Sequence, residues 1–380
     1  MRFNHLKSLY LSGIVFLLLL AIGFLLSERK LLWNDELYSQ QTAITVDSYA
    51  DILSFKFPDG NKNPLFYIIQ KTVCNIFSLH KLAISPHHLR PTRDIPAQII
   101  MRIPSNIYIS LALSLIFYFF SRFYSVFIAF YALGVALVSP MVWMYWVEAR
   151  PYPLWFLLTT IQLLLLYCRR IAPEIEIVKP LLLVHLLLAF TSSASMIQIS
   201  IAFLILLCWK GKYNKMQLGL ICAVPIGIAL FYNFFNLSFK IKTYLFSSNL
   251  FDAVMPERLF VYVIYALTAW ALPKKYKTSS GNIFFLLIFL LFLASGLFIL
   301  LMDLNTKNSD FGFFSRYLIY IAPADILMYS LASFDLFQWS RKNTWIYINV
   351  SIFLGGLVIM RGLMTYRAIL GEATYLHVPG

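Results

Sequence analysis

Two adjacent carboxylates, Asp35 and Glu36, are the residues of this sequence best placed to do chemistry. They lie in Trp33-Asn34-Asp35-Glu36-Leu37-Tyr38, just after an apolar run from Leu9 to Leu26. A carboxylate beside a bilayer is costly to desolvate, so acids at such positions usually mark functional sites. Neighbours on a helix point about 100° apart and cannot flank one bond as a glycosidase pair does. Asp35 is therefore expected to accept a proton from an acceptor hydroxyl, and Glu36 to brace an arginine or the helix start.

A purely structural role for the same stretch is the alternative. Asn34 or Asp35 can cap a helix, and carboxylates are favoured near helix N-termini. The acids alone do not decide between these roles, so the choice depends on partners elsewhere in the chain.

The stretch Glu148-Ala149-Arg150-Pro151-Tyr152 offers such partners at the end of a later apolar run. Proline stops the helix and fixes the backbone where Arg150 leaves it. Arginine suits bidentate binding of phosphate or carboxylate. The alternatives are a Glu148–Arg150 surface pair, or an interfacial anchor within an aromatic belt. That belt would contain Trp143, Trp146 and Trp155.

Two further arginines stand beside prolines at expected span ends. Arg316-Tyr317-Leu318 precedes Pro323, which frees a backbone carbonyl one turn back and is expected to kink its helix. Arg316 falls at headgroup depth, where a lipid-linked phosphate lies. Arg102-Ile103-Pro104-Ser105 repeats the arrangement of an arginine beside a proline-started helix. A simple helix-end anchor is the alternative for both arginines.

Composition places these residues in a membrane protein. Of 380 residues, 60% are hydrophobic and only 13% are charged, with a mean hydropathy of +0.74. A soluble domain cannot cover so much apolar surface with so little charge. The net charge is +14, and the Lys and Arg residues lie in short loops rather than along one stripe. This placement is typical of loops that set membrane topology and contact anionic lipid, and it does not favour nucleic-acid binding. No Gly-rich phosphate loop occurs, and the four cysteines lack metal-ligand spacing.

Apolar runs predict an all-α polytopic membrane protein of about eleven spans, because about 20 residues cross the hydrocarbon core. We treat residues 1–380 as one integral membrane domain, with an uncleaved first anchor and Lys/Arg-rich loops in the cytoplasm. The predicted spans are 8–26, 103–120, 124–139, 153–167, 180–191, 195–209, 215–235, 257–272, 283–301, 316–334 and 344–360.

The longest connection, residues 27–102, faces outward and should carry structure of its own. Asp35 to Leu53 is predicted as an amphipathic helix. Asn63-Pro64 is typical of an N-cap followed by proline at the first helical position. The following helix, Leu65 to Phe77, is short and interrupted by Lys71, so it is expected to lie along the membrane surface.

This topology brings the candidate residues to one face of the membrane, which is the main argument for a site there. The residues assigned to the site are Asp35 as the catalytic base and Glu36, Arg102, Glu148, Arg150, Tyr152, Arg316 and Tyr317 for substrate binding. No metal ligand is assigned, although a divalent metal is possible.

In this order and on one side, the motifs resemble those of the GT-C glycosyltransferases, in particular the protein O-mannosyltransferase and aminoarabinose transferase superfamily. The matching pieces are Trp33 to Tyr38, Asn63-Pro64-Leu65-Phe66-Tyr67, Arg102 to Ser105, Glu148 to Tyr152, and Arg316-Tyr317-Leu318 with Pro323. The sequence departs from the family pattern at Lys62, where histidine is frequent, and at Thr191 to Ser195, where a His-Tyr-like pair is frequent.

The resemblance implies a GT-C-like bundle with juxtamembrane helices in the first outer loop. It also implies a polyprenyl-phosphate sugar donor, inversion at the anomeric carbon, catalysis by Asp35, and donor phosphate binding by Arg316 and by Arg150. The acceptor would be a lipid-linked glycan, a cell-envelope polymer or a protein, reached from the periplasmic face of an inner membrane. A membrane transporter or flippase, or an O-antigen-type polymerase, is the alternative for polyprenyl-linked glycans.

Overall fold

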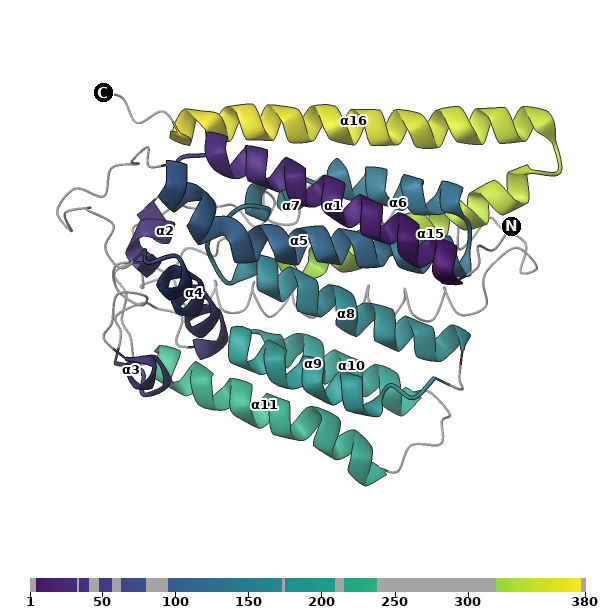
Figure 1. Cartoon of the computed structure of the whole chain (residues 1–380). Helices are drawn as coiled ribbons and strands as arrows, with labels where there is room; N and C mark the ends of the chain where they lie inside the picture. The colour runs from purple at the N-terminus through teal and green to yellow at the C-terminus, as the bar shows by residue number, and fades with distance from the viewer. Residues whose placement is uncertain are drawn as a thin grey trace, which may run out of the picture.

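The computed structural model of the chain is a bundle of helices (Figure 1). It describes residues 5–32, 34–40, 48–56, 63–79, 95–172, 175–208, 215–237 and 319–376. Within these ranges every regular element is a helix, and there is no strand. The predicted all-α class is therefore confirmed for the part of the chain that the structure describes.

Five described helices are long and apolar enough to cross a bilayer, whose hydrocarbon core of about 30 Å needs about 20 residues. They match predicted spans in position. These helices are α1 (His5–Arg29), α5 (Ile95–Phe123), α8 (Tyr152–Ile171), α15 (Ala322–Ser340) and α16 (Thr344–Leu376).

Shorter apolar helices occupy four other predicted positions. They are α6 (Val126–Leu137), α9 (Val178–Thr191), α10 (Ser195–Cys208) and α11 (Lys215–Leu237). The predicted spans 257–272 and 283–301 lie outside the described residues. The count of eleven spans thus stays a prediction, while the multi-helix membrane architecture is supported directly.

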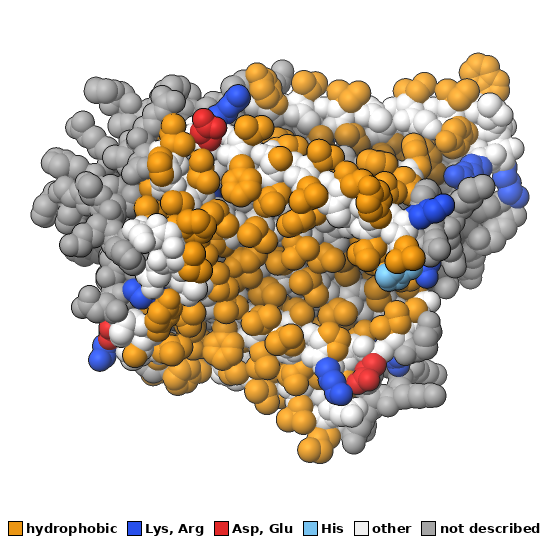
Figure 2. All heavy atoms as spheres, viewed as in Figure 1, with side chains coloured by type: hydrophobic (Ala, Val, Ile, Leu, Met, Phe, Trp, Pro, Cys, Tyr) orange, Lys and Arg blue, Asp and Glu red, His pale blue; other side chains and the backbone are white. Residues whose placement is uncertain are grey.

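Helix α5 is the centre of one half of the bundle. It packs against α1, α6 and α8, and the second half continues from α8 through α9 to α10 and α11. Helix α15 packs on α6, α8 and α16. Large side chains fill the interior, including Phe117, Phe120, Trp146 and Trp155, each at most 2% exposed. By contrast, the face shown in Figure 2 is covered with hydrophobic side chains, and charged ones lie near its margins. This distribution suits a surface bathed in lipid.

Three short helices gather at the end of the bundle where α1 finishes and α5 begins (Figure 1). They are α2 (Asn34–Ser39), α3 (Tyr49–Leu53) and α4 (Pro64–Ile76). Helix α4 packs on α5 and α9 as well as on α3. The first long loop therefore carries three short helices, and their place along the membrane surface stays a prediction.

The start of α4 follows the predicted pattern with one difference. Asn63 has the extended backbone of an N-cap and Pro64 is the first helical residue, but the Asn63 side chain makes no capping bond. Its amide instead donates to the carbonyl of Ala189 at 2.7 Å. Since Ala189 lies near the end of α9, Asn63 ties the first loop to the bundle.

Three local predictions are wrong. The helix predicted over Asp35 to Leu53 is not continuous, because Ser48 has extended backbone and caps a new helix by accepting the Asp51 N–H at 3.2 Å. Pro104 does not start its helix, because α5 already begins at Ile95. Pro323 does not kink α15, because it sits in the first turn, where its missing N–H is not needed.

Candidate functional site

The candidate site is organised by an ion pair between Glu36 of α2 and Arg102 of α5. Their side chains approach to 2.6 Å between Oε2 and Nη2, and a second bond of 2.9 Å joins Nε to Oε1. Both side chains are fully buried. This is the bidentate arrangement that arginine makes best with a carboxylate. The sequence-based expectation that Glu36 braces an arginine is met in the structure.

Arg102 also holds the end of α1. Its Nη1 donates to the carbonyls of Ser27, at 3.2 Å, and of Lys30. Its Nη2 donates to the carbonyl of Leu31 at 2.7 Å. Together with the two bonds to Glu36, these contacts occupy the five N–H donors that a guanidinium has. Helix ends leave carbonyls without intrahelical partners, and Arg102 supplies donors to those that close α1.

Glu36 reaches a third segment as well. Its Oε1 accepts the backbone N–H of Ala149 at 2.7 Å, in the turn between α7 (Pro140–Tyr145) and α8. Burial by itself raises the pKa of the Glu36 carboxyl. The charge and hydrogen bonds of Arg102, the charge of Lys30 and the Ala149 N–H all lower this pKa, and their combined effect is larger than that of burial. The result is a pKa below the ordinary value of 4.5. Glu36 is therefore held as a carboxylate.

The turn from Glu148 to Tyr152 is fastened to α5 and α2 by further bonds. The Ser105 hydroxyl of α5 donates to the carbonyl of Glu148 at 2.6 Å, and the Arg150 N–H bonds the same carbonyl at 2.7 Å. The Arg150 guanidinium donates through Nη1 to the Ser39 hydroxyl of α2. Helix α2 is thus anchored at two points, through Glu36 near its middle and through Ser39 at its last residue.

Two more polar side chains complete this junction. Gln98, one turn before Arg102, donates to the carbonyl of Lys30 at 2.6 Å. The Lys30 ammonium donates to the carbonyl of Met144 in α7 at 3.1 Å. The ends of α1, α5 and α7 are therefore bound into one unit with α2. We call this unit, made by Glu36, Arg102, Gln98, Ser105 and Arg150 with their partners, the Glu36–Arg102 junction.

The structure thus brings together five of the eight predicted site residues. Glu36, Arg102, Glu148, Arg150 and Tyr152 lie in or beside the Glu36–Arg102 junction, and each is at most 8% exposed. Tyr152 packs its ring at 5.2 Å from that of Tyr145. The Asp35 backbone belongs to α2, but its side chain lies outside the described part of the molecule, as do Arg316 and Tyr317.

The simpler alternatives for the middle motif do not fit the observed burial. Glu148 and Arg150 are 2% and 8% exposed, so they do not form a surface pair. Trp146 and Trp155 are at most 2% exposed and face the interior rather than lipid. An aromatic belt at the membrane interface therefore does not explain these two tryptophans.

Several site residues carry no obvious signal in the sequence. Ser39, Gln98 and Ser105 contribute to the Glu36–Arg102 junction, yet neither serine nor glutamine is by itself a sign of a functional site. The usable signal is their position, because Gln98 and Ser105 flank Arg102 at helical spacing on the same helix. Among the described residues no three His, Cys, Asp or Glu side chains are grouped so as to hold a metal ion.

Two charged residues, Glu36 and Arg102, connect parts of the chain that are far apart in sequence. The bonds described above join the Arg102 and Glu36 side chains to each other and to backbone groups at the end of α1 and in the turn before α8. What they hold is α2, the helix that carries Asp35.

Comparison with known proteins finds no matching family model, no matching curated protein and no matching solved structure.

Proposed function

We propose that this protein is a membrane glycosyltransferase that moves a sugar from a polyprenyl-phosphate donor to a hydroxyl acceptor, with inversion at the anomeric carbon. The observation that supports it best is the Glu36–Arg102 junction. Three motifs that resemble GT-C sequences, around residues 36, 102 and 149, are far apart in the chain and are joined there by direct hydrogen bonds.

In the proposed reaction the acceptor hydroxyl attacks the anomeric carbon of the donor. The bond between that carbon and the phosphate oxygen breaks, and the polyprenyl phosphate leaves with the electron pair. Asp35 takes the hydroxyl proton as the new bond forms. Arg316, with Tyr317 beside it, and Arg150 are assigned to the phosphate, whose developing charge a guanidinium stabilises in a site shielded from water.

The Glu36–Arg102 junction has a positioning part in this mechanism. A base must lie within hydrogen-bond reach of the proton that it takes, and small displacements of catalytic groups cost large factors in rate. Glu36 is the neighbour of Asp35 in α2, and its bonds to Arg102 and Ala149 set where that helix lies. We therefore assign Glu36 and Arg102 to holding the base rather than to touching substrate.

We place the site on the periplasmic side of a bacterial inner membrane. The Lys/Arg-rich loops are expected in the cytoplasm, and α2 to α4 lie at the end of the bundle where α1 finishes and α5 begins (Figure 1). The acceptor class that suits this location is a lipid-linked glycan, a cell-envelope polymer or a protein.

The direct test incubates purified protein with a radiolabelled polyprenyl-phosphate hexose and a fraction of envelope lipids and glycans. A transferase releases unlabelled polyprenyl phosphate and moves the label to the acceptor fraction. A flippase, reconstituted in vesicles, moves the labelled donor across the bilayer without cleaving it. If the purified protein leaves the donor intact but moves it across the bilayer of vesicles, the protein is a transporter and not a transferase.

A further inference from the structure

Pro225 lies inside α11 and removes one of its backbone hydrogen bonds. Proline has no N–H, so the carbonyl of Ile221, four residues earlier, lacks its usual helical donor. In the structure the His185 Nδ1 lies 2.9 Å from the Ile221 oxygen. His185 belongs to α9 and is fully buried. An imidazole from the neighbouring helix therefore replaces the bond that Pro225 removes.

The contacts define how the imidazole is used. A carbonyl oxygen only accepts, so Nδ1 carries the hydrogen that it donates to Ile221. The other nitrogen, Nε2, lies 2.9 Å from the amide nitrogen of Gln162, which only donates. His185 is thus a donor toward α11 and an acceptor toward α8. Both of its nitrogens are engaged within the protein.

The chain of bonds continues across the bundle. The Gln162 oxygen accepts from Gln198 Nε2 at 2.9 Å, and the Gln198 oxygen accepts from the indole N–H of Trp155 at 2.6 Å. The Trp155 ring stacks on Tyr320, with ring centroids 5.2 Å apart. An indole only donates and a carbonyl only accepts, so every bond in this chain runs in one direction. We call Trp155, Gln198, Gln162 and His185 the polar relay.

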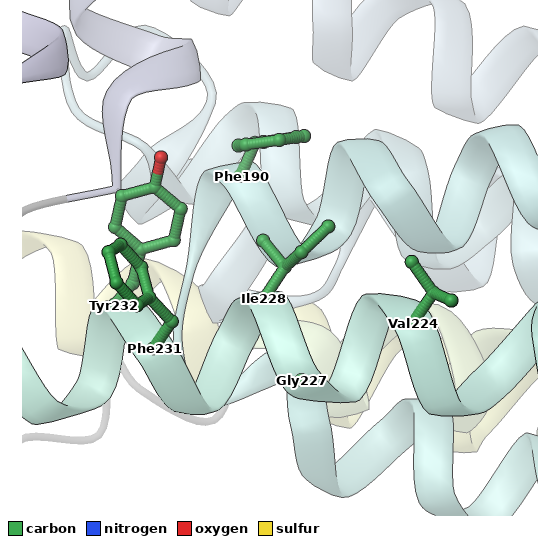
Figure 3. Close-up of a pocket in the computed structure, with 6 residues that line it drawn as sticks. All are labelled: Phe190, Val224, Gly227, Ile228, Phe231 and Tyr232. Carbon is green, nitrogen blue, oxygen red and sulfur yellow. The ribbon is translucent and has the colours of Figure 1, made fainter.

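The polar relay ends one turn from an apolar pocket of 420 Å³ between α9 and α11 (Figure 3). Phe190 of α9 faces a row of α11 side chains across it. The α11 residues that line it are Val224, Gly227, Ile228, Phe231 and Tyr232. A Cβ added at Gly227 would meet no atom within 4 Å, so this glycine helps to leave the space open. The pocket wall is therefore the part of α11 that follows the missing hydrogen bond.

We propose that His185 is a positioning residue that replaces the hydrogen bond lost at Pro225 and so holds the pocket-lining half of α11 in register with α8. Without it, the buried Ile221 oxygen would have neither a helical nor a side-chain donor, which disfavours the present helix position. The polar relay then transmits this register to Trp155, one turn from Tyr152 at the head of α8. The proposal does not depend on the reaction assigned above.

Backbone hydrogen exchange of the full-length protein in detergent, followed by mass spectrometry of peptides that cover 222–237, tests this role. His185→Leu keeps the volume but removes both bonds, and exchange in this part of α11 is expected to rise about tenfold. His185→Asn places an amide near the former Nδ1, so it should keep protection close to that of the wild type. Peptides from α1 serve as the internal control.

The decisive variant is the double change His185→Leu with Pro225→Ala. Alanine at 225 has an N–H for the Ile221 carbonyl, so protection and thermal midpoint should return toward those of Pro225→Ala alone. If exchange in residues 222–237 of the double variant stays as fast as in His185→Leu, the proposal is overturned. A rise in exchange of about tenfold in His185→Asn relative to the wild type would overturn it as well, and this comparison does not require His185→Leu to fold.

Discussion

Glu36 and Arg102 are 66 positions apart in the chain, yet their side chains meet at 2.6 Å with no exposure to solvent. The pair joins a helix of the first long loop to the second long helix of the bundle. A buried ion pair is weak support for stability in itself, because desolvation offsets most of the attraction. Its main consequence is that α2 has one position relative to α5 and to the turn before α8.

Removing one partner of this pair should be far more harmful than removing both. Arg102→Ala leaves a buried carboxylate and several carbonyls without donors, so we expect a loss of about 3–5 kcal/mol in unfolding free energy. The double variant Glu36→Gln with Arg102→Ala removes the buried charge as well and should recover a substantial part of that loss. Equilibrium unfolding in detergent measures both, with Arg122→Ala at the other end of α5 as the control. If the losses caused by Arg102→Ala and by Glu36→Gln simply added in the double variant, the two side chains would not be coupled.

The stability of the protein should also fall in acid because of Glu36. Its folded-state pKa is lowered below 4.5, so the folded state binds a proton less readily than the unfolded state. The stabilisation is present above pH 4.5 and is lost as the pH falls through the lowered folded value. Thermal midpoints of the wild type and of Glu36→Gln, recorded from pH 6 downward, should converge in acid. Parallel curves would assign the acid sensitivity to other groups.

Gly23 should not tolerate a side chain. A Cβ there would overlap the side-chain amide of Asn106. The Asn106 amide is fixed by a bond of 3.0 Å to the carbonyl of Leu20 and accepts the indole N–H of Trp146 at 3.3 Å. Gly23→Ala must therefore break these bonds or separate α1 from α5, at a cost of about 1–3 kcal/mol. Gly13→Ala in the same helix is the matched control, since nothing lies within 4 Å of its Cβ, and it should be neutral or stabilising.

Asp35→Asn should reduce transfer by orders of magnitude without unfolding the protein. General base catalysis contributes about 10²–10⁴-fold, so turnover should fall by a factor in this range while the thermal midpoint stays unchanged. Glu28→Gln is the control, because Glu28 is an exposed acid near the same end of the bundle. Transfer at a near-normal rate in Asp35→Asn would remove Asp35 from the role of base.

Arg316→Ala and Arg150→Ala should weaken use of the donor rather than of the acceptor. A guanidinium assigned to the phosphate contributes to donor binding and to departure of the leaving group, so the donor KM should rise or kcat should fall. Ser39→Ala removes only the hydroxyl that meets Arg150 and should have a smaller effect. Donor kinetics that are unchanged in Arg316→Ala would leave that residue as a helix-end anchor.

Much of the architecture follows from the sequence alone. A bilayer requires long apolar helices, so run length and the positions of Lys and Arg predict where α1, α5, α8, α15 and α16 lie. Proline positions are less informative by themselves. Pro64 does begin a helix, whereas Pro104 lies inside one, because tertiary packing and not local propensity decides whether a helix continues through a proline.

Sequence spacing alone did not determine which polar groups meet. It brought the motifs around 36, 102 and 149 to one end of the bundle but could not pair Glu36 with Arg102 or assign Ser105 to the Glu148 carbonyl. In the same way, Pro225 in the sequence predicts that the Ile221 carbonyl lacks a helical donor, but nothing nearby in the sequence indicates that His185 supplies one. Hydrogen bonds depend on distances of a few tenths of an ångström, and only the packing of whole helices sets distances between residues so far apart in the chain.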